Sequence, residues 1–140
     1  MKTITKITLS TIIVLTSILT YGQHSKVSVE ISNIDSEEGV ILVALFDSEA
    51  NFLKKAVQRD QVDAKNGTVN VSFDNVKAGT FAVSVIHDEN NNGGLDTNMM
   101  GIPSEPYGVS MDGKNMFGPP SYDKAKFEVA DKNVDLKITL

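Results

Sequence analysis

The sequence has no cysteine among its 140 residues. This absence excludes disulfide bonds, thiolate metal sites and a cysteine nucleophile. The HExxH pattern of zinc hydrolases, a phosphate-binding glycine loop and the nucleophile elbow of serine hydrolases are missing as well. The residues therefore indicate no catalytic set and no cofactor-binding pattern. Stability must come from an apolar core, with a bound ion as the one remaining aid.

Positive charge is also scarce in this chain. Thirteen Lys and Arg residues stand against eighteen Asp and Glu residues, which gives a formal net charge of −5. The bases form no cluster, and this argues against nucleic acid as a partner. An acidic surface suits an exported protein or a protein that meets cations.

No apolar run is long enough to span a membrane. The run from Ile7 to Leu19 has 13 residues, whereas a spanning helix needs about 20. Lys2 and Lys6 precede this run, and Thr20 and Gly22 follow it as small residues. We therefore predict a signal peptide at residues 1–22 rather than a membrane anchor. Cleavage leaves residues 23–140 as one domain that does not span the membrane, and places it in the periplasm or outside the cell.

Alternating apolar and polar residues predict most of the mature chain to be β-strand. The alternating segments are residues 26–34, 68–73 and 80–87. Residues 40–46 are apolar at every position, which predicts a central strand covered on both faces. Residues 126–130 and 134–140 are expected to form a terminal hairpin. Short strands separated by turn signals predict an all-β fold, a single antiparallel β-sandwich of immunoglobulin-like or transthyretin-like type with six to seven strands and one long ordered loop.

Two further segments are assigned from weaker patterns. Asp47 or Ser48 can cap a short helix that ends at Lys55, with Phe52 and Leu53 facing inward. Residues 58–65 are polar and are expected to be a connection.

The stretch from His87 to Tyr122 differs from the rest of the chain. It contains all four prolines and six of the ten glycines. A loop of this length is unusual in a compact domain. We expect either that part of it, best residues 108–111, pairs as a further strand or that it is a functional loop held in a fixed shape by its prolines.

The start of this stretch is a candidate cation site. Asp88, Asn90, Asn92 and Asp96 follow the spacing of the first nine positions of a calcium loop, and Gly93 permits the sharp turn. Met99 stands where an EF-hand has its bidentate Glu, so the last carboxylate must be Asp96 itself, Glu105 or Asp123. The predicted metal ligands are therefore Asp88, Asn90, Asn92, Asp96 and Glu105, with calcium as the cofactor. The alternative is a turn held without metal by Asn and Asp side chains.

Two other functions remain open from the residues alone. One is a hydrolase that uses His87, Asp88 and Glu105, which requires these groups to share an open pocket. Ser104, Ser110 and Ser121 are weak candidates for a nucleophile. The other is an interaction or structural module of the cell envelope, without metal and with an unidentified partner. We favour a protein that is not an enzyme.

The same stretch contains several large apolar residues, which are Met99, Met100, Met111, Met116, Tyr107, Phe117 and Tyr122. We expect them to pack the loop onto the sandwich. A soft recognition surface is the alternative.

Several short motifs occur in a fixed order along the chain. Residues 78–83 (AGTFAV) lead into residues 87–98 (HDENNNGGLDTN), and residues 101–103 (GIP) and 118–121 (GPPS) follow. Over essentially the whole mature chain this series resembles the bacterial secreted family known as domain of unknown function 2141. The resemblance implies an exported β-sandwich and brings no activity. The family usually has Glu-Gly-Tyr-Gly-Phe-Ser where this chain has the sequence EPYGVS at residues 105–110.

Overall fold

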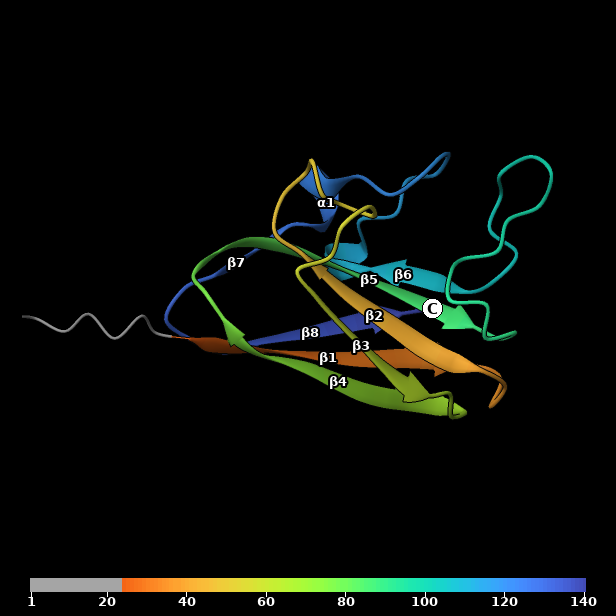
Figure 1. Ribbon diagram of the computed structural model, residues 1–140, viewed down its shortest axis with the longest axis horizontal. Coiled ribbons are helices and arrows are strands. Elements are labelled where there is room, and N and C mark those ends of the chain that lie inside the picture. The colour runs from red at the N-terminus through yellow and green to blue at the C-terminus, as the bar shows by residue number, and fades with distance from the viewer. Residues whose placement is uncertain (1–23) are drawn as a thin grey trace, which may run out of the picture.

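The computed structural model describes residues 24–140, so the predicted signal peptide lies outside the described residues. Within this part of the chain, eight strands form two facing sheets in a sandwich-like arrangement (Figure 1). The strands are β1 (Ser25–Ile34), β2 (Val40–Phe46), β3 (Gln58–Asp63), β4 (Gly67–Val76), β5 (Gly79–Asp88), β6 (Tyr107–Val109), β7 (Phe127–Val129) and β8 (Val134–Thr139). A short 3-10 helix, η1 (Ser110–Asp112), follows β6, and one helical turn, α1 (Tyr122–Ala125), precedes β7.

The first sheet has three strands in the order β4-β1-β8, and the second has five. In the second sheet the order is β3-β2-β5-β6, and β7 pairs with the same strand β5. The β1–β8 pair is parallel and the other pairs are antiparallel. The predicted sandwich architecture is thus confirmed, whereas the predicted six to seven strands and wholly antiparallel pairing are wrong.

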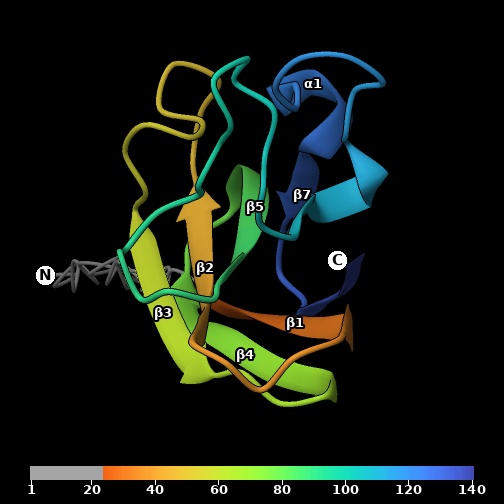
Figure 2. The ribbon, with the colours of Figure 1, turned by 90° about the vertical axis from the view of Figure 1, so that its right-hand side faces the viewer.

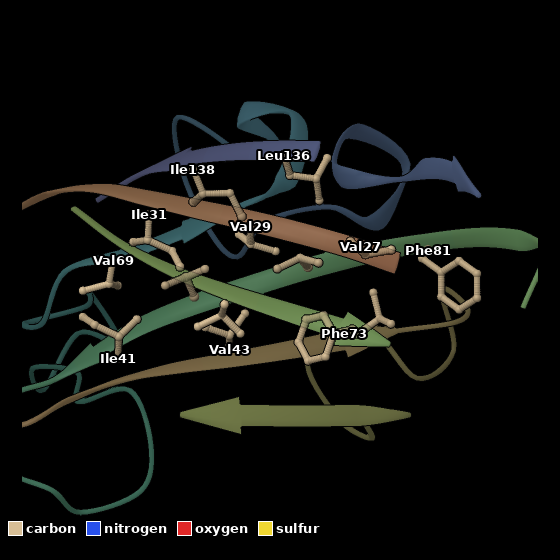
Figure 3. Packing of buried hydrophobic residues seen from close by; sticks show 14 of the residues in the cluster. Val27, Val29, Ile31, Ile41, Val43, Val69, Phe73, Phe81, Leu136 and Ile138 are labelled. Carbon is tan, nitrogen blue, oxygen red and sulfur yellow. The ribbon is translucent and has the colours of Figure 1, made fainter. Parts of the chain in front are cut away.

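The main core lies between the two sheets. Figure 3 shows side chains of β1, β4 and β8 packed beside those of β2 and β5. Val27, Val29 and Ile31 of β1 are completely buried, as their alternation with polar residues predicts. Burial of each such side chain contributes about 1.5–3 kcal/mol, so this row of three contributes about 5–9 kcal/mol to the hydrophobic stabilisation.

The predicted connection at residues 58–65 is wrong, because Gln58–Asp63 forms β3. This strand pairs with β2 from Val40↔Asp63 to Leu45↔Gln58. It lies at the edge of its sheet and keeps most of its side chains in solvent. An edge strand needs only backbone pairing on one side, and its polar sequence therefore gives no alternation to detect.

The predicted terminal hairpin is also wrong. β7 pairs with Gly79–Phe81 of β5, and β8 pairs with β1 in the opposite sheet. The chain therefore crosses from one sheet to the other between the two strands. The further strand expected at residues 108–111 is confirmed in part, since residues 107–109 form β6 along the edge of β5, whereas residues 110 and 111 lie in η1.

A second cluster of buried residues covers part of the outer face of the five-stranded sheet, which is the face turned away from β1. It contains Phe46, Phe52, Ala82, Val109 and Ala125. Phe52 makes edge-to-face contacts with Phe46 and Tyr122, at ring centroid distances of 5.4 and 5.6 Å. Burial raises the pKa of Tyr122, whose hydroxyl donates a hydrogen bond to the Thr80 carbonyl oxygen.

The segment that follows β2 is a series of turns, so the predicted helix ending at Lys55 is wrong. Leu53 has a positive φ of 58°, which breaks any helix there. Phe52 faces inward as predicted, but the Leu53 side chain is exposed. No helix within residues 24–140 has the length and apolar character needed to cross a membrane.

Candidate functional site: an apolar groove on the outer face

Three segments stand on the outer face of the five-stranded sheet. They are the turn after β2 (residues 47–57), the first loop (residues 89–106) and the second loop (residues 113–121), and Figure 2 shows them rising on the side away from β1 and β4. The outer face of β2 is left partly open between them, because Leu42 and Ala44 are only half-buried. The expectation that β2 is covered on both faces is wrong for this face.

Strand register fixes the floor between these segments. Ala44 of β2, Ser84 of β5 and Val109 of β6 lie in one row across the sheet. Leu42, Ile86 and Tyr107 form the adjacent row. Side chains in such rows point to the same side of a sheet. The floor is therefore aliphatic, with one hydroxyl and one phenol.

A groove of about 630 Å³ opens over the β5–β6 part of this floor. We call it the apolar groove. The residues that line it include no charged side chain; they are Leu53, Ser84, Val85, Ile86, Leu95, Thr97, Met100, Gly101, Ile102, Pro103, Tyr107, Gly108, Val109, Asn115, Met116, Phe117, Gly118, Pro119 and Pro120. Ligand sites in proteins are concave, mostly apolar and of about 300–1,000 Å³, and this groove has those properties.

Large apolar side chains of the two loops are exposed rather than packed. The exposed fractions are 103% for Met99, 80% for Met100, 90% for Met116 and 87% for Phe117. Ile102 and Met111 are also more than half exposed. The prediction that these methionines and Phe117 pack the loop onto the sandwich is therefore wrong, although Tyr122 does pack against Phe52. The alternative of a soft recognition surface fits the structure.

Two buried carboxylates hold the base of the first loop. The Asp88 carboxylate accepts hydrogen bonds from the backbone N–H groups of Asn92 (3.0 Å) and Gly93 (2.8 Å). The Glu105 carboxylate accepts from the N–H groups of Glu89 and Asp96, each at 2.9 Å. Both side chains are buried, and the backbone donors satisfy them. The first loop is therefore fixed at its two ends.

Asn98 holds the tip of the same loop. Its side-chain oxygen accepts hydrogen bonds from the N–H groups of Met100 (2.9 Å) and Ile102 (3.1 Å). Its own N–H donates to the Ile102 carbonyl oxygen, and Thr97 bridges to Pro103. The Met100 backbone is thereby fixed at one wall of the groove.

The second loop forms the opposite wall. Asn115 donates from its side-chain nitrogen to the Pro119 carbonyl oxygen at 2.7 Å and accepts from Lys124 Nζ at 3.0 Å. Lys114 Nζ lies 4.9 Å from the centroid of the Tyr107 ring, a cation–π distance. These contacts join the second loop to α1 and to β6.

The predicted cation ligands come together only in part. The Asp96 carboxylate accepts from the side-chain nitrogens of Asn90 (2.5 Å) and Asn92 (2.7 Å). Glu105 binds the backbone N–H groups of Glu89 and Asp96, while Asp123 lies on α1 and pairs with Lys126. Among residues 24–140, no group of three His, Asp or Glu side chains is placed to hold a metal ion. The calcium site with its Asn ligands stays a prediction.

The residues of the hydrolase hypothesis do not share an open pocket. His87 is buried, and its Nε2 lies 2.8 Å from the Glu38 carbonyl oxygen. Neither His87 nor Glu105 lines the apolar groove. Among the candidate nucleophiles, Ser110 is buried and binds backbone groups of Val83 and Ala125.

Gly39 explains how the turn before β2 reaches this region. It has a φ of +72°, and a Cβ atom there would lie 2.0 Å from the Asp88 carbonyl oxygen. Only glycine allows both the conformation and the close approach. The turn can therefore lie against the end of β5 and place the Glu38 carbonyl at His87.

Reasoning from the sequence missed the floor of the groove. The signal was present in residues 40–46, where apolar residues at consecutive positions put Leu42 on the face opposite the core. The same run predicts burial on both faces. An unbroken apolar run is equally consistent with a strand that lines a ligand site.

The fold and the groove together define a small two-sheet β domain with an apolar site on the outer face of one sheet. The chain belongs to a family described as "Uncharacterized protein conserved in bacteria (DUF2141)", which matches residues 29–137. This match confirms the resemblance seen in the sequence. No curated protein and no solved structure matches the chain.

Proposed function

We propose that the protein is a non-catalytic binding domain, acting in the periplasm or outside the cell, that holds the apolar part of a small molecule in the apolar groove. The observation that carries the proposal is a groove of about 630 Å³ whose lining has no charged residue and whose rim exposes Met100, Met116 and Phe117. The predicted signal peptide supports the location.

The exposed apolar side chains of the rim favour binding, because their contact with water is unfavourable in the free protein. A ligand that covers these side chains removes apolar surface from water, which contributes about 25 cal/mol for each Å². Exposed apolar patches on soluble proteins commonly mark interaction sites. The two loops are also fixed by hydrogen bonds, so that little ordering entropy is lost on binding.

The test is binding of a neutral fluorescent probe, N-phenyl-naphthylamine. We expect the native protein to bind it, and Met116→Ser combined with Phe117→Ser to weaken binding at least about tenfold, since each 1.4 kcal/mol of lost burial is a factor of ten. Val57→Ser is the matched control, because Val57 is 46% exposed and lies outside the groove. An unchanged affinity in the double variant, or no binding to the native protein, would contradict the proposal.

Strand order supports the transthyretin-like alternative for the sandwich. In a constant-type immunoglobulin sandwich the first two strands lie in the same sheet. Here β1 and β2 lie in different sheets, and β1 pairs with the last strand. We therefore propose a transthyretin-like sandwich.

Calcium binding by the first loop is a second candidate function. The observation that favours it is the contact of the Asp96 carboxylate with the side-chain nitrogens of Asn90 and Asn92, next to the backbone N–H groups of Asn92 and Gly93 that the Asp88 carboxylate binds. Carboxylate and amide oxygens are the ligands that calcium prefers. A cation there would brace the groove, because Leu95 and Thr97 line it.

Thermal unfolding with calcium or with a chelator tests this candidate. Calcium at 100 times its Kd stabilises the folded state by about 2.7 kcal/mol. We expect the melting temperature to rise with calcium, and Asp96→Asn to reduce the rise. The control is Asp123→Asn, which removes an equal charge outside the loop. Equal melting temperatures in millimolar calcium and in chelator would exclude the site.

The other two functions have less support. The hydrolase hypothesis lacks an open pocket that contains His87 and Glu105. A protein partner in the envelope remains the alternative occupant of the groove. It becomes the better explanation if the neutral probe does not bind, and if purified envelope proteins bind the native protein through Met116 and Phe117.

A further inference from the structure

The apolar groove continues into a second groove, of about 730 Å³, over β2 and β3. Four residues line both grooves: Leu53, Ser84, Ile86 and Leu95. The two grooves therefore adjoin at these residues, and together they cover the outer face of the sheet from β3 to β6; we call the pair the trough. Leu53, which has the positive φ of 58°, contributes to both halves.

The two halves of the trough differ in polarity. The half at β6 has no charged lining residue, whereas the half at β3 includes Arg59, Asp60 and Gln61. Register places Arg59 opposite Ala44 and Gln61 opposite Leu42. Both side chains therefore extend the two rows of the floor to its polar end.

Arg59 is the single arginine of the chain and the single cation that lines either groove. The ion pairs among residues 24–140 are formed by lysines, and the Arg59 guanidinium forms no hydrogen bond with these residues. Asp60 also lines this half, but it pairs with the inward-facing Val43, so that its side chain leaves the strand on the face opposite to that of Arg59, and its Oδ1 accepts the Gln61 N–H at 2.8 Å. The outer face thus presents a positive charge at this end.

We infer that the ligand is an amphiphile with an anionic head group, a long-chain monocarboxylate, whose head is bound by Arg59 and whose chain lies in the apolar groove. This inference rests on the proposed function. The planar guanidinium matches a carboxylate with two parallel hydrogen bonds. Three inter-strand spacings of about 4.8 Å separate β3 from β6, so the trough is about 14 Å long. Dodecanoate suits that length.

Two other cations lie near the β6 end of the trough: Lys124, whose Nζ donates to Asn115 Oδ1 at 3.0 Å, and Lys114. Lys114 lies over the Tyr107 ring and is not among the lining residues. If Lys114 bound the carboxylate, the ligand would lie in the opposite orientation, with its head group at β6 and its chain toward β3. Lys114→Gln therefore tests the orientation, and Lys65→Gln, at an exposed residue outside both grooves, controls for net charge.

The experiment measures displacement of N-phenyl-naphthylamine by dodecanoate and by dodecanol at neutral pH. We expect dodecanoate to bind at least about tenfold more tightly than dodecanol, as a charge-assisted bidentate contact implies. Arg59→Gln is expected to abolish that difference without weakening dodecanol. Lys65→Gln and Lys114→Gln are expected to preserve it.

The possible failures are distinct. Equal affinities for dodecanoate and dodecanol in the native protein, or loss of the difference in Lys114→Gln rather than in Arg59→Gln, overturn the inference and leave the proposed function intact. If the probe itself does not bind, both the inference and the proposed function are wrong.

Discussion

Ser110 takes the place of a backbone group in the five-stranded sheet. β6 and β7 pair with the same edge of β5 but leave Ala82 and Val83 between them. The Ser110 hydroxyl accepts the Val83 N–H at 2.9 Å and donates to the Ala125 carbonyl oxygen at 2.6 Å. One side chain therefore joins the break in the edge to the helical turn that precedes β7.

Ser110→Ala is expected to lower the free energy of unfolding by about 1–3 kcal/mol, because it leaves the buried Val83 N–H without a partner. Urea unfolding measures the effect. Ser104→Ala is the control, since Ser104 is exposed and its hydroxyl forms no hydrogen bond with the described residues. Equal stability of the two variants would show that the hydroxyl does not maintain the sheet edge.

At the scale of elements, α1 is a single turn that depends on its neighbours. Ser121 caps it by accepting the Lys124 N–H, and Tyr122 packs on Phe52 of the turn after β2. The Tyr122 hydroxyl also reaches the Thr80 carbonyl oxygen at 3.1 Å. The helical turn and the turn after β2 thus hold each other on the sheet.

The raised pKa of Tyr122 predicts a loss of stability in alkali. The folded state favours the neutral phenol, so its contribution is fully present below the ordinary pKa of 10.0 and is lost as pH rises through the higher folded value. We expect Tyr122→Phe to show a smaller fall in the free energy of unfolding above about pH 10. Identical pH profiles for native protein and Tyr122→Phe would contradict this assignment.

Elements with a clear period of two could be predicted from the sequence. β1, β4 and β5 alternate around buried Val, Ile and Phe side chains, and their predicted ranges lie within three residues of those observed. β3 could not be found in this way because its pairing uses backbone groups and its sequence is polar. The predicted pairing of β7 with β8 is wrong. Strands that are adjacent in sequence commonly form a hairpin, but here β7 pairs with β5 and β8 pairs with β1 in the other sheet.

The sequence predicts which loop residues belong to the candidate site, but it does not predict where these residues lie relative to the sheet. The sequence singled out the loops that contain Met100, Met116 and Phe117. It could not show that Asp88, Glu105 and Asn98 would hold the first loop away from the sheet by binding its backbone. It also could not bring Arg59 into one row with Ala44, since that depends on pairing across β2 and β3.

For the whole molecule, the five-stranded sheet has apolar clusters on both faces. The main cluster lies between the sheets, and the smaller one lies under α1 and the turn after β2. The apolar groove lies beside the smaller cluster, and Val109 belongs to both. The groove is therefore supported by the less extensive of the two clusters.

Phe52→Ala is expected to cost about 3 kcal/mol, the lower end for loss of a buried aromatic ring. Amide hydrogen exchange should become faster in residues 47–57 and 122–125 while β1 and β4 open only with global unfolding. Phe73→Ala, in the main cluster, is the control and should accelerate exchange throughout. Uniform acceleration in Phe52→Ala would show that the two clusters unfold as one unit.

The parallel pairing of β1 with β8 bears on when the chain can fold. Val27 to Ser32 lie beside Val134 to Thr139, more than one hundred positions later in the sequence. Contacts of such long sequence separation slow folding to milliseconds or seconds. β1 is made early, yet it remains without one of its two neighbours until β8 has been made. The three-stranded sheet can therefore be completed only after residues 134–139 have been synthesised, however early β1 and β4 are available to pair.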